Sequence, residues 1–158
     1  MKRPKVTPDG IRLVFNSAEA GLLSELAGQL AELLQGADDQ VGDAALERLL
    51  PDGYRDSTDD ADEFRRFTQT ELVDEKVAAA QGIVVALLKR DAAGAARLVL
   101  SESEAVAWLR SLNDIRLALA ARMGIVDESF RPNLADNTFA IYTWLGGVQF
   151  ALLRAVDR

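Results

Sequence analysis

Two short segments of this chain repeat one another at a spacing of 85 residues. Residues 11–20 read IRLVFNSAEA and residues 96–105 read ARLVLSESEA. In each copy an alternating run, typical of a half-buried strand, meets a polar residue that is followed three positions later by a glutamate and then by a leucine-rich helical pattern. The repeat therefore predicts two strand-into-helix units within one chain.

The remaining patterns complete a mainly helical α+β fold in a single domain over residues 1–158. We expect a bundle of about five helices beside a small two- or three-stranded β-sheet. A Pro-Asp-Gly turn predicts a hairpin over residues 1–15, and the second copy of the repeat predicts a strand over residues 96–100. Helical patterns cover residues 16–35, 44–50, 59–67, 70–89, 101–123 and 136–156.

Composition removes several classes of function. The sequence contains neither cysteine nor histidine, which excludes thiolate chemistry, the common zinc sites and histidine-based catalysis. A net charge of −7 disfavours nucleic acid as a partner. The N-terminal residues do not resemble a secretory signal, and the longest apolar run, residues 83–88, is too short to span a bilayer. We therefore expect a cytoplasmic protein without a membrane partner.

Two basic residues fall where the helical pattern calls for apolar ones. Arg116 lies in the middle of the apolar face of the helix predicted over residues 101–123, and Lys76 lies on the apolar stripe of the preceding helix. Tyr142 and Gln149 lie at the edge of the apolar face of the last helix. The opposite, wet face of the helix that holds Arg116 is expected to carry Arg110, Ser111, Asp114 and Arg122.

These positions allow two interpretations. In the functional one, Lys76, Arg116 and Gln149 line a polar cleft between three helices that holds an anionic ligand or a partner's carboxylate. In the structural one, the two cations snorkel to the surface or pair with a carboxylate from residues 52–62. The structural interpretation is favoured, because buried charges are usually paired within their own chain.

An acidic segment offers oxygen ligands of the kind that calcium sites use. Its spacing matches no EF-hand and lacks the central glycine of that loop, so we expect a solvated loop and a negatively charged helix start, with no metal site and no cofactor. The residues concerned are Asp56, Asp59, Asp60, Asp62 and Glu63.

Four segments together resemble a known family. They are residues 49–56 (LLPDGYRD), 63–68 (EFRRFT), 108–119 (WLRSLNDIRLAL) and 142–145 (YTWL) with Gln149. They are similar to the signature of an actinobacterial domain-of-unknown-function family, number two thousand and seventeen, and the likeness covers nearly the whole chain. It implies that the family signature includes Tyr54, Arg55, Asn113, Asp114 and Arg116.

The resemblance implies no catalytic residues, because that family has no established activity. Its genes often lie beside that of a Clp protease adaptor, which suggests a pathway, and its members are sometimes described as transcriptional regulators. The latter role fits poorly with the acidic charge and with the lack of an evident helix-turn-helix.

We therefore expect a non-enzymatic, cytoplasmic regulatory or adaptor-like protein that binds another protein. The partner expected is a component of the Clp proteolytic pathway or a second copy of this chain, bound through the last helix. The alternatives are a transcriptional regulator, and a small-anion-binding protein or enzyme that uses the polar cleft around Arg116. The candidate binding residues are Lys76, Arg116, Asn113, Tyr142, Gln149, Tyr54 and Arg55.

Overall fold

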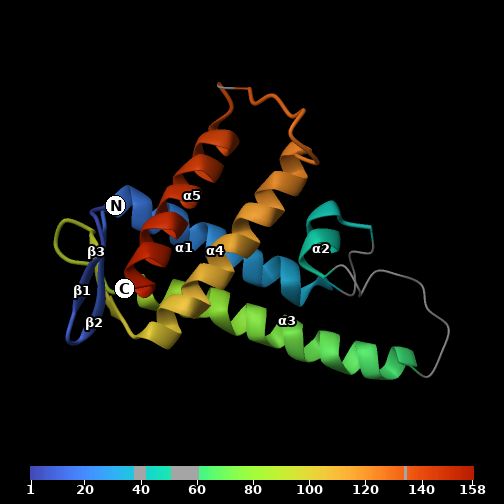
Figure 1. Ribbon diagram of the computed structural model, residues 1–158, viewed down its shortest axis with the longest axis horizontal. Coiled ribbons are helices and arrows are strands. Elements are labelled where there is room, and N and C mark those ends of the chain that lie inside the picture. The colour runs from blue at the N-terminus through green and yellow to red at the C-terminus, as the bar shows by residue number, and fades with distance from the viewer. Residues whose placement is uncertain (38–41, 51–60, 134) are drawn as a thin grey trace.

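The computed structural model describes residues 1–37, 42–50, 61–133 and 135–158, and of residues 61–66 it describes the backbone. It confirms a mainly helical α+β fold, with the sheet at one end of the helices (Figure 1). In chain order the elements are β1 (Lys5–Thr7), β2 (Gly10–Phe15), α1 (Ser17–Gln35), α2 (Ala44–Leu49), α3 (Ala61–Ala86), β3 (Ala96–Leu100), α4 (Glu102–Met123) and α5 (Asn137–Val156).

The sheet is antiparallel, in the order β1-β2-β3, and it joins the two copies of the sequence repeat. Leu13 pairs with Leu98, its own counterpart in the other copy. Because the strands run in opposite directions about this pair, β2 and β3 are related by an approximate local twofold axis. The inward residues of both strands, among them Phe15 and Leu100, are buried, and Arg12 and Arg97 face outward.

The helix that follows each of these strands begins with the same arrangement of capping hydrogen bonds. The Asn16 side chain accepts from the Glu19 amide at 2.9 Å, and the Glu19 carboxylate accepts from the Asn16 amide at 2.9 Å. Ser101 and Glu104 make the equivalent pair of bonds at 3.1 and 2.7 Å. Both are capping boxes, which satisfy amide groups that a helix start leaves unpaired.

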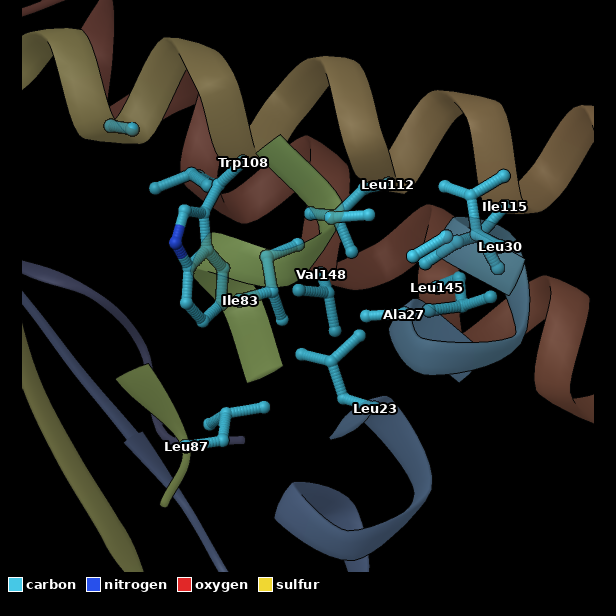
Figure 2. Close-up of a cluster of buried hydrophobic side chains, with 14 of the residues drawn as sticks. Leu23, Ala27, Leu30, Ile83, Leu87, Trp108, Leu112, Ile115, Leu145 and Val148 are labelled. Carbon is cyan, nitrogen blue, oxygen red and sulfur yellow. The ribbon is translucent and has the colours of Figure 1, made fainter. Parts of the chain in front are cut away.

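The core lies where the helices meet behind the inner face of the sheet. Phe15 of β2 stacks on Trp108 of α4, with ring centroids 6.1 Å apart. Side chains from α1, α3, α4 and α5 continue this core in Figure 2, where the labelled residues are Leu23, Ala27, Leu30, Ile83, Leu87, Trp108, Leu112, Ile115, Leu145 and Val148.

The structure corrects two expectations about the helices. Residues 59–67 and 70–89 were predicted as separate helices, but α3 runs unbroken from Ala61 to Ala86. Thr68 and Gln69 between them are polar, yet neither is a proline or glycine, so nothing at this point interrupts the backbone hydrogen bonds. Residues 59 and 60 lie outside the described part of the chain.

The second correction concerns the expected wet face of α4. Ser111 and Asp114 are buried there, with 1% and 4% of their surfaces exposed. The reason is the central place of α4, which contacts α1, α2, α3 and α5. A helix packed on so many sides keeps little room for a solvated face.

Candidate functional site

Arg116 joins α4 to α5 through its guanidinium group. The Nη1 atom donates to Oε1 of Gln149 at 3.2 Å, and Cζ lies 4.3 Å from the centre of the Tyr142 ring. Gly146 makes room for this arrangement, because a β-carbon there would come within 3.2 Å of Nη2. Contacts of this kind between a guanidinium and an aromatic ring contribute about 1 kcal/mol, and more where water is excluded.

Lys76 joins α3 to α4 through an ion pair. Its Nζ lies 2.8 and 2.9 Å from the two carboxylate oxygens of Asp114. The Asp114 side chain is 6% exposed and that of Lys76 is 20% exposed. Burial raises the pKa of Asp114 more than the adjacent ammonium of Lys76 lowers it. Ionisation of this carboxylate therefore costs the hydration that it loses on burial, and the Lys76 ammonium offsets part of that cost.

The predicted three-helix cleft is divided by these contacts. Asp114 and Arg116 are two positions apart on α4, so their side chains leave the helix on nearly opposite sides. Arg116, Tyr142 and Gln149 come together between α4 and α5, whereas Lys76 is held by Asp114 at the contact with α3. Lys76 thus has the internal carboxylate that the structural interpretation required, supplied by α4.

Other predicted site residues lie elsewhere. Asn113 is exposed on α4. Tyr54 and Arg55 fall outside the described residues, as do the side chains of the acidic segment and any contact that they make. Sequence reasoning missed Asp114 as the partner of Lys76, although one signal was present, since a lysine on an apolar stripe requires a nearby carboxylate.

A different feature of α5 emerges from its packing. Residues 137–153 contain no charged side chain, yet the buried residues of the helix are only Leu145, Val148, Leu152 and Ala155. Away from them lies a row of exposed residues at the spacing of one helical face. We call this row the α5 outer face, and it consists of Ala140, Thr143, Gly147 and Phe150.

The exposed apolar character of α5 is unusual for a helix of this length. Asn137–Val156 is long and apolar enough to cross a membrane by length and composition, and 17% of its most apolar window is buried. Phe150 and Leu153 are 61% and 52% exposed. The apolar character of this helix is not evident from the sequence, because Thr143, Gly146 and Gln149 interrupt every long apolar run within residues 137–156. A helix that serves only a protein core is mostly buried, so the packing described here leaves part of the apolar surface of α5 uncovered.

Comparison with known proteins identifies the family of this chain and several named relatives. The model of the family described as Domain of unknown function (DUF2017) matches residues 1–156. The proteins named Oxidative stress regulator AosR from Mycobacterium tuberculosis and Mycobacterium bovis are 35% identical over 182 aligned residues, which cover 90% of this chain and 81% of theirs. A relative from Mycobacterium leprae is 30% identical over 187 residues, with 92% and 82% covered. No solved structure matches.

Proposed function

The chain belongs to the DUF2017 family, and on that premise we propose that it is a cytoplasmic regulatory protein that acts by binding another protein. The mycobacterial relatives are named as oxidative stress regulators, which supports a regulatory role here. The observation that carries the proposed mode of action is the α5 outer face. It offers an uncharged helical surface, since residues 137–153 contain no charged side chain, on a chain in which 27% of the residues are charged.

The geometry of this face suits a protein partner. Exposed residues at helical spacing form a stripe that a groove or a second helix can cover. The small residues Ala140 and Gly147 permit close approach of a backbone, and Phe150 supplies a large apolar side chain for the contact. Contiguous exposed apolar surface on a protein marks an interaction site more often than it marks chance.

The absence of cysteine from the sequence limits how such a regulator responds to oxidants. Thiolate oxidation is the usual chemistry of a protein redox sensor, and this 158-residue sequence has no thiol to oxidise. We infer that an oxidative signal, if it reaches this chain, arrives through the protein that the chain binds. A component of the Clp pathway, implied by the family resemblance, remains a candidate for that partner.

The two alternative functions have less support. A transcriptional regulator that contacts DNA needs a basic surface to neutralise phosphates, whereas this chain carries a net charge of −7. At Arg116 the guanidinium stacks on Tyr142 and its Nη1 donates to Gln149, so an anion could use only the remaining N–H groups, of which the Nε group is buried without a hydrogen-bond partner among the described residues.

A matched pair of glycine variants tests the proposal. Gly147→Arg places a charge in the middle of the α5 outer face, and Gly82→Arg places the same charge on the exposed side of α3. At both positions an added β-carbon meets no atom within 4 Å, so both variants are expected to fold. Each tagged variant is expressed in an actinobacterial host and purified with its bound proteins, with and without nuclease.

We expect one or more proteins to be retained by the wild type and by Gly82→Arg, and to fall at least tenfold with Gly147→Arg. Nuclease treatment should leave them bound. The proposal is overturned if Gly147→Arg retains the same proteins as Gly82→Arg, or if nuclease releases everything that the wild type holds. Circular dichroism of both variants confirms that a loss of binding does not reflect a loss of folding.

A further inference from the structure

A basic hollow lies beside the lower end of the α5 outer face, where the last turns of α5 meet the residues around β1. Figure 1 shows this end of α5 next to the sheet. The hollow has a volume of about 360 Å³. Its lining comes from the N-terminal segment and from α5, and consists of Arg3, Pro4, Val6, Phe150, Ala151, Arg154, Ala155 and Arg158.

The side chains that line the hollow include three arginines. Arg3, Arg154 and Arg158 are all exposed, and among the described residues none of them takes part in an ion pair. None of the lining residues is an aspartate or a glutamate. Three unpaired arginines in one place are notable on a chain with 25 acidic and 18 basic residues. Guanidinium groups bind carboxylates with two parallel hydrogen bonds, so this cluster is suited to an acidic ligand.

Part of the lining of the hollow is apolar. Val6 lies opposite the buried Ile11 in the sheet and therefore on the same face, yet it is 51% exposed. Phe150 is 61% exposed, and the Arg154 guanidinium lies 5.8 Å from its ring centre. A ligand that matches the lining of the hollow therefore brings an apolar side chain as well as negative charge.

We propose that this hollow binds an acidic segment of the partner protein, in which carboxylates flank one large apolar side chain. The inference rests on the proposed function, because it identifies the chemistry of the partner at one end of the α5 outer face. The carboxylates pair with Arg3, Arg154 and Arg158, and the apolar side chain packs between Val6 and Phe150. Nucleic acid is a poorer fit, since its phosphates are read along an extended basic stripe.

A selection from random peptides tests this chemistry without knowledge of the partner. A library of displayed peptides of about twelve residues is selected on the wild-type chain, and the enriched peptides are synthesised with a fluorescent label. Their dissociation constants are measured for the wild type, for the Arg3→Glu/Arg154→Glu double variant and for the control Arg110→Glu. Arg110 is exposed on α4 and does not line the hollow, so its reversal tests charge alone.

We expect the enriched peptides to carry Asp or Glu around a Leu, Phe or Trp. The double variant should weaken their binding at least tenfold, with Arg110→Glu within about twofold of the wild type. Replacing the apolar side chain of the peptide with alanine should weaken binding to a similar extent. In parallel, the binding of labelled duplex DNA and of vesicles with anionic lipid is measured for the same three proteins.

Three results would overturn the inference. They are a selection that enriches no peptide, enriched peptides that bind the double variant as well as the wild type, and DNA or vesicles that bind the wild type and lose binding in the double variant. These failures are distinguishable from failure of the proposed function, because Gly147→Arg lies outside the hollow. If the partner is lost with Gly147→Arg but not with Arg3→Glu/Arg154→Glu, the α5 outer face still binds the partner, and the proposal that the hollow binds an acidic segment is rejected.

Discussion

Arg116 and Lys76 are both cations inside a helical bundle, and the fold accommodates them differently. Lys76 has a buried carboxylate within 2.9 Å on both oxygens, which is a full ion pair. Arg116 has an aromatic ring and a neutral amide instead. The delocalised charge of a guanidinium is more weakly hydrated than that of an ammonium, which makes this neutral environment acceptable for arginine. The two residues therefore predict different responses to substitution and to pH.

Lys76→Met removes the ammonium and keeps most of the side chain. At pH 7 the Asp114 carboxylate is then buried without a partner, and we expect the free energy of unfolding to fall by about 3 kcal/mol. The folded state raises the pKa of Asp114, so the folded chain binds this proton more readily than the unfolded chain does. Stability from this group therefore rises as pH falls toward the unfolded value of about 4. The deficit of Lys76→Met should be smaller at about pH 4.5 than at pH 7.

Urea unfolding of the wild type and Lys76→Met at both pH values measures this difference. The double variant Lys76→Met/Asp114→Asn is the control, because an uncharged amide should make the deficit independent of pH. Equal deficits of Lys76→Met at the two pH values would contradict the account of Asp114 as a carboxylate destabilised by burial.

The stacking of Arg116 on Tyr142 should appear as an energetic coupling. In a double-mutant cycle with Arg116→Leu and Tyr142→Ala, we expect a coupling of about 1 kcal/mol in the free energy of unfolding. Arg154 and Phe150 give a matched control, since they are exposed and their guanidinium-to-ring distance is 5.8 Å. Coupling energies of the same size in the two cycles would show that the contact between Arg116 and Tyr142 stabilises the fold no more than an exposed pair does.

At the scale of elements, α5 holds two adjacent glycines with opposite surroundings. Gly147 is open, whereas a β-carbon at Gly146 would meet the Arg116 guanidinium at 3.2 Å. Alanine favours a helix over glycine by up to about 1 kcal/mol. We expect Gly147→Ala to raise the free energy of unfolding by about this amount and Gly146→Ala to raise it less, with the shortfall reduced in an Arg116→Leu background. Equal gains in thermal unfolding would mean that Gly146 makes no room for Arg116.

The two capping boxes are expected to contribute equally to stability, each at the start of its own helix. Asn16→Ala and Ser101→Ala each leave helix amides without an acceptor, so each should lower the free energy of unfolding by about 1 kcal/mol. Ser103→Ala is the control, because the Ser103 hydroxyl contacts that of Ser101 and accepts from no cap amide in the described bonds. Chemical denaturation measures these costs. If Ser101→Ala lowers the free energy of unfolding no more than Ser103→Ala does, the Ser101 cap does not stabilise the start of α4.

At the scale of the whole molecule, the local elements were predictable and their surroundings were not. The strand-into-helix units follow from short-range signals, namely alternation and the Asn16 and Ser101 caps. The burial of Asp114 depends on the other helices that contact α4, and no pattern within α4 records them. The exposure of Phe150 is hidden for the same reason, since periodicity identifies an apolar residue and leaves open whether anything covers it.

The distribution of charge also becomes meaningful at this scale. A net charge of −7 describes an acidic protein, yet Arg3, Arg154 and Arg158 gather beside the α5 outer face. An acidic protein with a basic hollow is selective, because its net charge repels acidic partners and the hollow attracts and orients them. This arrangement is consistent with a regulator that docks one partner in one orientation.

The most direct measurement of the central claim is site-specific photo-crosslinking in living cells. Thr143→p-benzoylphenylalanine places the reactive group on the α5 outer face, and Gln81→p-benzoylphenylalanine places it on the exposed side of α3. We predict an adduct with a different protein from position 143 only, lost on addition of Gly147→Arg and kept with Gly82→Arg. An adduct of twice the chain's own mass, an adduct with lipid or nucleic acid alone, or no adduct from position 143 would contradict the claim that α5 binds a different protein.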